Sequence, residues 1–183
     1  MKADGEMMEF TFETTYNQKA VTAMAKTLRK TIRKKRSRRA HVLGWIVIAL
    51  VLLFTLPLGE NKFTFDIRTV ITWLAGIVIL LVLLFEDSIN GYIARKRMLA
   101  GTGRGATIFQ DETFTTTTEI GKTEFIYDKI NLLAETDSYF VFVYDKSHAQ
   151  VYDKGRLSGG TVEEFRKFIA EKTGKEITKI KAK

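Results

Sequence analysis

Residues 42–58 read VLGWIVIALVLLFTLPL and residues 69–85 read TVITWLAGIVILLVLLF, and neither stretch holds a charged side chain. A helix of either length extends about 26 Å, close to the shortest span of the hydrocarbon core of a bilayer. A buried helix of a water-soluble protein keeps a polar face, whereas these stretches are apolar all round. The first begins only at Val42 and no small-residue cleavage site follows it, so we expect no signal peptide. The sequence therefore predicts two transmembrane helices.

Positive charge is concentrated beside the first apolar stretch. Nine basic and no acidic residues lie between Lys26 and Arg39, and without them the formal charge falls from +8 to −1. Residues 95–97, which follow the second stretch, are all basic. Basic flanks resist translocation, which predicts a multi-pass protein of the cell membrane with both termini cytoplasmic and the connection, residues 59–68, outside. Because the charge is local, we expect the lipid bilayer as a partner and no nucleic acid.

The apolar stretches carry few other features. They contain no ionisable residue, which argues against a proton-coupled transporter or pump built from this hairpin alone. Gly44, Gly76 and Thr72 are small enough to let the two helices approach closely. Trp45 and Trp73 lie near the inner and outer ends of their helices, where indole rings act as membrane anchors.

The N-terminal region changes its periodicity at Tyr16. Residues 8–14 (MEFTFET) alternate between apolar and polar, which is typical of a half-buried strand. From Tyr16 to Ile32 an apolar residue recurs at every fourth position, which predicts a helix. We expect this helix to continue into the first span and to pack on its counterpart, residues 86–100. The alternative is an amphipathic surface helix that binds anionic lipid.

Three glycines at alternate positions follow that counterpart, in Gly101-Thr102-Gly103-Arg104-Gly105. Glycines in this arrangement end a helix and form a flexible joint. A phosphate-binding loop has the opposite order, because its glycines follow a strand and open a helix. We therefore predict a hinge at residues 101–105.

The remaining sequence alternates between short strand-like runs and turns, and the threonine run 115–118 suits exposed strand positions. The predicted strands are 106–110, 113–119, 122–127, 130–136, 139–145 and 149–152. On the fifth of these, Phe140, Phe142 and Tyr144 share one face, which we expect to be core.

A C-terminal helix follows the strands. Thr161 and Glu164 form a capping-box pattern at its start, and Gly174 ends it. The basic tail beyond it, residues 175–183, is expected to be loose. If the strand at 8–14 pairs with the later six, then seven strands and one helix outline a pleckstrin-homology-like domain with the hairpin inserted after the first strand.

The predicted fold class is an α+β membrane protein, in which a two-helix transmembrane hairpin carries a cytoplasmic antiparallel β domain capped by a C-terminal helix. Its parts, in chain order, are an N-terminal strand that pairs with the C-terminal domain (1–15), the hairpin with cytoplasmic helical extensions (16–100), the glycine hinge (101–105), the β domain plus helix (106–174) and the basic tail (175–183).

Two segments of this layout resemble the YcxB-like family of bacterial membrane proteins. They are EFTFETTYNQ at residues 9–18, ahead of the basic helix and two adjacent spans, and residues 109–169, from FQDETF to EEFRKFI. The resemblance implies a pleckstrin-homology-like C-terminal domain, and it implies no enzymatic activity and no site residues. The chain departs from the family at residues 152–154, where the family has a more apolar run that ends in proline.

No group of residues predicts catalysis or metal binding. The chain has no cysteine, and neither His41 nor His148 has a second histidine at metal-ligand spacing, which argues against a zinc site. Ser147 and His148, with Asp145 and Asp153 nearby, supply the residue types of a nucleophilic triad. Neighbours on one turn rarely face inward together, however, so ordinary turn chemistry explains them better.

Adjacent carboxylates occur at residues 111–112 and 163–164, where a turn and a helix start explain them. We therefore predict no enzyme, no catalytic residue, no metal and no cofactor. Three functions remain open. The first is a membrane-anchored binding or sensing module with a protein partner or a second copy of the chain. The second is an immunity protein against a bacteriocin or another toxin, and the third is a membrane effector of a defence system that a small ligand gates.

Overall fold

The computed structural model describes residues 9–55 and 66–181. Most of the predicted connection between the spans and residues 56–58 of the first span therefore lie outside the described residues. The helices are α1 Gln18–Lys30, α2 Lys34–Thr55, α3 Ile67–Leu84, α4 Glu86–Lys96 and α5 Val162–Thr173, with single 3-10 turns η1 Tyr127–Lys129 and η2 Lys154–Arg156. The strands are β1 Phe10–Thr15, β2 Arg104–Phe109, β3 Thr113–Thr118, β4 Gly121–Ile126, β5 Leu132–Glu135, β6 Tyr139–Val143, β7 Ala149–Asp153, β8 Leu157–Ser158 and β9 Ile177–Lys179.

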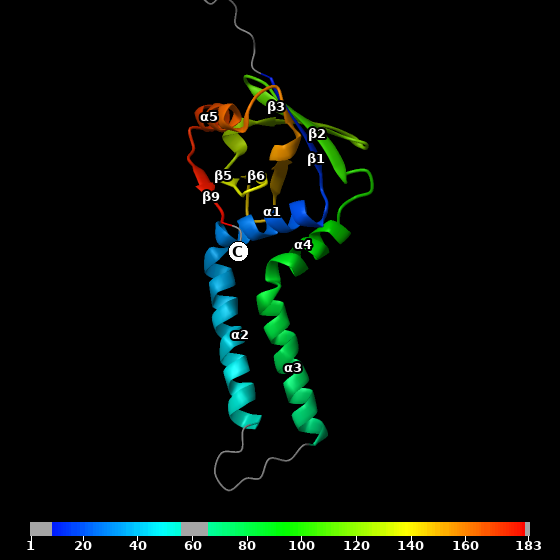
Figure 1. The fold of residues 1–183 in the computed structure, drawn as a ribbon, viewed down its shortest axis with the longest axis vertical. Coiled ribbons are helices and arrows are strands. Elements are labelled where there is room, and N and C mark those ends of the chain that lie inside the picture. Colours follow the sequence, from blue (N-terminus) through cyan, green and yellow to red (C-terminus); the bar gives the residue numbers. More distant parts are fainter. Residues whose placement is uncertain (1–8, 56–65, 182–183) are drawn as a thin grey trace, which may run out of the picture.

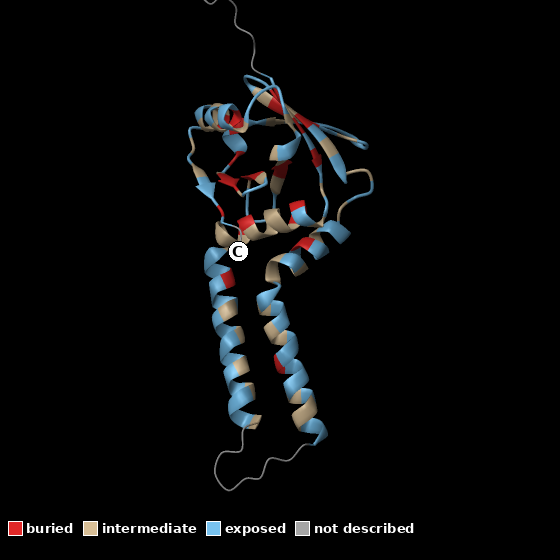
Figure 2. Cartoon of the chain, viewed as in Figure 1, coloured by how far each residue is buried: buried red, intermediate tan, exposed pale blue. Residues whose placement is uncertain are grey.

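Helices α2 and α3 lie side by side and extend away from the β domain (Figure 1). Both are long and apolar enough to cross a membrane, by length and composition. Their apolar side chains are not buried by the rest of the chain, because only 6% of the most apolar window of α3 and none of that of α2 is buried (Figure 2). The two helices therefore differ from the core helices of a water-soluble protein.

The two span glycines lie where α2 and α3 approach each other, as predicted. A Cβ at Gly44 would lie 2.8 Å from a methyl carbon of Leu83, and a Cβ at Gly76 would lie 3.1 Å from Val51. The Thr72 hydroxyl does not link the two helices, because it donates to the carbonyl of Arg68 in its own helix at 2.9 Å.

Helix α1 does not continue into α2, contrary to the prediction. A turn at residues 31–33 separates them, and α1 lies across the end of the hairpin, beneath the β domain (Figure 1). The cause is the apolar stripe of α1, in which Ala20 and Leu28 pack with Val141 of β6 and Ile180. If α1 continued straight into α2, this apolar stripe would lose its contacts with the second sheet.

The opposite side of α1 packs on α4, so the predicted contact with residues 86–100 is present. Gly91 of α4 lies so close to α1 that a Cβ there would be 2.5 Å from the hydroxyl oxygen of Thr22 and 2.9 Å from its Cα. Asn17 caps the start of α1, because its side chain accepts a hydrogen bond from the backbone N–H of Ala20 at 2.9 Å. The helix is therefore shared between the β domain and the hairpin.

The strands form two sheets, in the orders β4-β3-β2-β1-β8 and β7-β6-β5-β9. Strand β1 pairs antiparallel with β2, with Phe10 opposite Phe109, and also with β8. The N-terminal strand therefore joins strands that follow the hairpin, which is the pairing that the sequence suggested. Every pair is antiparallel except that of β5 with β9, in which Leu133 lies opposite Ile177.

Two predicted segments are more ordered than expected. Residues 177–179 of the tail form β9, and the Ile180 side chain after it is only 6% exposed. At the predicted hinge, Arg104 and Gly105 belong to β2, and the carbonyl of Gly103 accepts a hydrogen bond from the backbone N–H of Tyr16 at 2.9 Å. In both segments the order comes from pairing with strands that are distant in the sequence, β1 for residues 104–105 and β5 for residues 177–179.

An aromatic core fills the space between the sheets, and α5 closes it at one side. Its largest fully buried members are Phe10, Phe12, Phe109, Phe114, Phe140, Phe142, Tyr152 and Phe165. The core face predicted for β6 is confirmed for Phe140 and Phe142, while Tyr144 is partly buried against that core. The other face of β6, with Val141 and Val143, is buried beneath α1.

Candidate functional site

The polar residues that join the helices cluster around the first turn of α4. Asp87 in that turn binds Arg29 of α1 through two hydrogen bonds, from Nε to Oδ1 at 2.5 Å and from Nη2 to Oδ2 at 2.7 Å. A carboxylate also interacts favourably with the positive end of the helix dipole at this position. The fork of the guanidinium matches both carboxylate oxygens, so the pair fixes orientation as well as distance.

The neighbouring residue, Glu86, binds α2. The Ser37 hydroxyl donates to Oε2 of Glu86 at 3.0 Å, and Nε2 of His41 lies 2.7 Å from the same oxygen. Nε of Arg29 lies 3.6 Å from it. The histidine that the sequence places at the membrane boundary thus has a carboxylate partner from the other side of the hairpin. Together these residues lock α1, α2 and α4 into one unit.

The position of this junction cluster (Arg29, Ser37, His41, Glu86 and Asp87) strengthens its interactions. The side chains of Arg29 and Asp87 are 26% and 19% exposed, so water screens their attraction less than at an open surface. The hydrogen bond to Asp87 raises the pKa of Arg29, which keeps the guanidinium charged. In chemical terms the cluster is a set of ion pairs and hydrogen bonds between helices, which suits holding those helices together.

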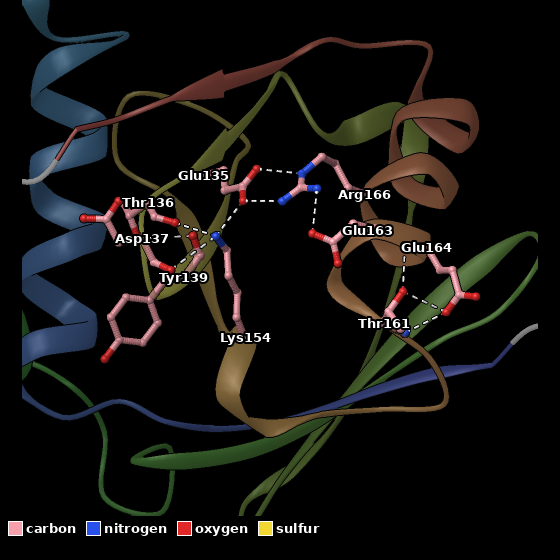
Figure 3. Close-up of polar contacts among 9 residues, drawn as sticks. All are labelled: Glu135, Thr136, Asp137, Tyr139, Lys154, Thr161, Glu163, Glu164 and Arg166. Atoms are coloured by element: carbon pink, nitrogen blue, oxygen red, sulfur yellow. Dashed lines mark hydrogen bonds and ion pairs between the residues drawn. The ribbon is translucent and has the colours of Figure 1, made fainter.

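A second charged cluster lies in the β domain (Figure 3). Oε1 of Glu135, at the end of β5, accepts from Nζ of Lys154 at 2.5 Å and from Nη2 of Arg166 at 2.8 Å, while its Oε2 accepts from Nε of Arg166 at 2.9 Å. The Glu135 side chain is only 8% exposed. The hydrogen bonds from Arg166, and secondly that from Lys154, lower its pKa to about 2.

The Glu135 cluster ties three elements together. Lys154 comes from η2 and Arg166 from α5, and Nζ of Lys154 also donates to the carbonyl of Thr136 at 2.6 Å. A buried carboxylate is tolerated where charged donors bind both of its oxygens, as they do here. The cluster therefore positions α5 and the β7–β8 connection on the second sheet.

Asp145, Ser147 and His148, which supply the residue types of a nucleophilic triad, lie on one turn. Nδ1 of His148 lies 2.7 Å from Oδ2 of Asp145, and both side chains are exposed. Oδ1 of Asp145 accepts from the backbone N–H of Ser147 at 2.6 Å, and this bond is the largest cause that lowers the pKa of Asp145 to about 2. Asp153 lies apart and accepts from the backbone N–H of Gly155. The arrangement is that of a turn held by its aspartate.

One residue of each adjacent carboxylate pair forms an ion pair, with a residue distant in the sequence for Asp111 and with a near neighbour for Glu163. Asp111 forms an ion pair with Lys172 of α5, and Glu163 lies 3.4 Å from Nη1 of Arg166. The predicted capping box is confirmed, because the backbone N–H of Thr161 donates to Oε2 of Glu164 at 2.7 Å and that of Glu164 donates to the Thr161 hydroxyl oxygen (Figure 3). Within residues 9–55 and 66–181, no group of three or more His, Asp or Glu is arranged to hold a metal ion.

Sequence reasoning missed both charged clusters. One signal was present, because the basic residues 26, 29 and 30 recur at helical spacing and so share one face of α1. No signal in the sequence indicated the pairing itself, since Asp87 lies 58 positions from Arg29 and Arg166 lies 31 positions from Glu135. Such pairs become visible only when the fold is known.

These features define a class of architecture, an exposed apolar helix hairpin that ion pairs join to α1, which in turn packs on a two-sheet β domain. Comparisons of the chain with protein-family models, with curated proteins and with solved structures found no match. The function therefore has to be inferred from the geometry of this chain.

Proposed function

We propose that this chain is a multi-pass protein of the cell membrane that holds its β domain at the cytoplasmic face as a binding or sensing module without catalytic activity. The observation that carries the proposal is the outward-facing apolar surface of α2 and α3. Val42 to Phe54 and Ile67 to Phe85 contain most of the exposed large hydrophobic side chains of the described residues. Lipid is the environment in which such a surface is stable.

The orientation follows from the charges at the two inner flanks. The basic segment 26–39 covers the end of α1 and the start of α2, and Arg95 and Lys96 end α4. Both groups lie at the end of the hairpin that bears the β domain (Figure 1). Cytoplasmic flanks carry such an excess of Lys and Arg, so the β domain and both termini belong on that side.

The topology of the β domain supports a pleckstrin-homology-like architecture. Strands β1 to β4 form one antiparallel meander, β5 to β7 form a second, and α5 follows them in the chain and packs on the core between them. In this proposal the hairpin is an insertion between the first two strands, and β8 and β9 are additions. The resemblance to the YcxB-like family agrees with such a layout.

Helix α1 supports a role in sensing. One of its faces is buried against β6 and β7, and the other packs on α4 and carries Arg29, which binds Asp87. A partner that shifted the second sheet would therefore also shift the ends of both spans. The partner of such a module would be a protein or a second copy of this chain.

Single cysteines test the anchoring and the orientation, because the natural chain has none. Ser138→Cys on the β domain should react with a membrane-impermeant maleimide only after the cells are permeabilised. Ile67→Cys, at the far end of α3 and 76% exposed, should react in intact cells. The protein should also stay in the membrane pellet after an alkaline wash. Labelling in the reverse pattern, or release by the wash, contradicts the proposal.

The binding role has a separate test. Native mass spectrometry of the full-length protein in mild detergent should reveal a species of fixed stoichiometry, either with a partner protein or with a second copy. A bare monomer in every preparation would contradict a binding module while leaving the membrane anchoring intact.

A further inference from the structure

Three segments that are distant in the sequence meet beside the end of the hairpin that bears the β domain. Nε of Arg33, in the turn between α1 and α2, donates to the backbone carbonyl of Lys146 in the β6–β7 turn at 2.6 Å. Nζ of Lys30, at the end of α1, donates to the backbone carbonyl of Lys181 at 3.3 Å. The chain that follows β9 therefore reaches the junction of α1 and α2 (Figure 1), as does the β6–β7 turn.

The side chains at this meeting point are mostly cations. They form a basic patch of five residues, Arg33, Lys34, Lys35, Lys146 and Lys181. Arg33 is half-buried and the four lysines are exposed. The contacts of Lys146 and Lys181 use their backbone carbonyls, so both ammonium groups stay at the surface. Within residues 9–55 and 66–181, none of these four lysines forms an ion pair.

The carboxylates near the patch do not cancel its charge. Asp145, the one carboxylate of the β6–β7 turn, offsets one cation. On α4, Asp87 is matched by the two hydrogen bonds from Arg29, which lies outside the patch. Glu86 binds α2 through His41 and offsets one more cation when that histidine is neutral. Five cations against two carboxylates leave a formal excess of three positive charges, to which an anionic surface is complementary.

The position of the patch favours a lipid surface as its partner. Lys34 begins α2 and lies eight residues before Val42, where the apolar stretch begins, so the helix rises about 12 Å between them. The headgroup layer of a bilayer around α2 would fill roughly the first 5–8 Å of that rise. Its phosphates would then lie within about one screening length of the patch at physiological salt.

The orientation signal does not account for the whole patch. Basic residues that set the topology lie within about 15–20 residues of the end of a span, which covers residues 33–35. Lys146 and Lys181 lie 62 and 97 positions beyond Leu84, the end of α3. Only the fold of the β domain brings these two lysines back to the hairpin.

We propose that the basic patch docks the β domain on anionic phospholipid headgroups of the cytoplasmic leaflet, with Lys146 and Lys181 supplying the contacts beyond the hairpin. The proposal rests on the proposed function, because it requires the hairpin to be inserted with the β domain inside. A lysine near an anionic membrane surface contributes roughly a fivefold preference for that surface. Loss of both lysines should therefore weaken the docking roughly 25-fold.

A fluorophore on the β6–β7 turn tests the docking. Ser147→Cys in the full-length protein provides a single thiol at an exposed position, because the natural chain has no cysteine. The labelled protein is reconstituted in phosphatidylcholine vesicles with or without phosphatidylglycerol, at a constant fraction of a lipid that carries a nitroxide quencher on its headgroup. Quenching should rise several-fold when phosphatidylglycerol is present, and high salt should remove the rise.

Two double variants separate the patch from general surface attraction. Lys146→Gln with Lys181→Gln should abolish the rise and keep the fold, because the contacts of both residues within the protein use backbone carbonyls. The matched control is Lys129→Gln with Lys167→Gln, which removes the same charge at two exposed lysines of η1 and α5. Helix α5 lies at the end of the β domain away from the hairpin (Figure 1), so the control should keep the rise.

The outcomes also separate the docking from the membrane anchoring. A rise that survives in the patch variant, or an equal loss in both variants, overturns the docking. Flotation of the protein with the vesicles is measured on the same samples. A protein that floats but shows no quenching dependent on phosphatidylglycerol contradicts the docking alone. A protein that does not float with the vesicles contradicts the anchoring, and the docking with it.

Discussion

The β domain and the hairpin place the same type of side chain in opposite environments. Phe12 of β1 is fully buried and its ring contacts the rings of Phe109, Phe140 and Phe165, whereas Phe54 near the end of α2 is 80% exposed. Figure 2 shows this contrast over the described residues, with buried positions concentrated in the β domain and exposed ones along α2 and α3. One chain therefore has a part that buries its large apolar side chains and a part that leaves them exposed.

The largest effect should come from removing one phenylalanine in each region. Phe12→Ala leaves a cavity between the two sheets and should lower the free energy of unfolding of the β domain by about 4 kcal/mol. Phe54→Ala removes a side chain that the β domain does not use and should leave that free energy unchanged. Urea unfolding in mild detergent, followed by near-ultraviolet circular dichroism, measures both. Equal losses of stability would show that Phe54 contributes to the folding of the β domain as much as Phe12 does, which contradicts the contrast in burial.

Introducing a lysine at each of two equally exposed apolar residues tests which of them faces lipid and which faces water. Val78 in α3 and Ile120 at the β3–β4 turn are 58% and 59% exposed. Val78→Lys should cost about 3 kcal/mol of membrane insertion, because the ammonium would lie in the hydrocarbon core. Ile120→Lys should change insertion and folding by less than about 0.5 kcal/mol. The measurement is the fraction of protein in the alkaline-washed membrane pellet, and equal retention would contradict the assignment of α3 to lipid.

Acid should act on the β domain and leave the spans in place. The pKa of Glu135 is about 2 in the folded protein against an ordinary value of 4.5, so the unfolded chain takes up its proton first as the pH falls. The stability that this carboxylate contributes is complete above about pH 4.5 and is lost as the pH falls towards 2, by about 3 kcal/mol in all.

The variant Glu135→Gln tests this contribution. It should destabilise the β domain at neutral pH, because Lys154 and Arg166 lose their charged partner, and it should flatten the acid dependence of unfolding. If the hairpin is inserted in a membrane as proposed, its far-ultraviolet helix signal should persist through the same range. Acid dependence as steep as that of the natural protein would rule out the Glu135 cluster as its source.

The smallest effect concerns the junction between the two regions. Gly91→Ala should destabilise the packing of α1 on α4 by about 1 kcal/mol net, since the overpacking at the backbone of Thr22 outweighs the better helix propensity of alanine. Gly103→Ala is the matched control, because a Cβ there has no atom within 4 Å. Thermal unfolding in detergent compares the two variants. A stabilised Gly91→Ala protein would mean that the helices are not held so closely.

How much was predictable depends on whether the signal is local. The two apolar helices follow from hydropathy, and the strand predicted at residues 8–14, observed as β1 Phe10–Thr15, follows from alternation over a few residues. The apolar stripe of α1 was also visible, but periodicity shows only which residues share a face and not what covers them. It could not reveal that Ala20 and Leu28 pack on the second sheet, nor that a turn at residues 31–33 must follow.

The missed features depend on long-range pairing. Strand β9 has only three residues, Ile177–Lys179, and basic neighbours give it the composition of a tail, so only its pairing with β5 defines it. Likewise nothing beside Arg29 in the sequence indicates Asp87.

The insertion of the hairpin between β1 and β2 sets an order of assembly. During translation β1 leaves the ribosome first, yet its neighbour β2 begins only at Arg104, after both spans have been made. In the proposed membrane setting, the first sheet therefore closes only once the hairpin has entered the bilayer. Until then β1 is an unpaired strand with an exposed edge. A failure to insert should consequently leave the cytoplasmic part unfinished and open to proteolysis.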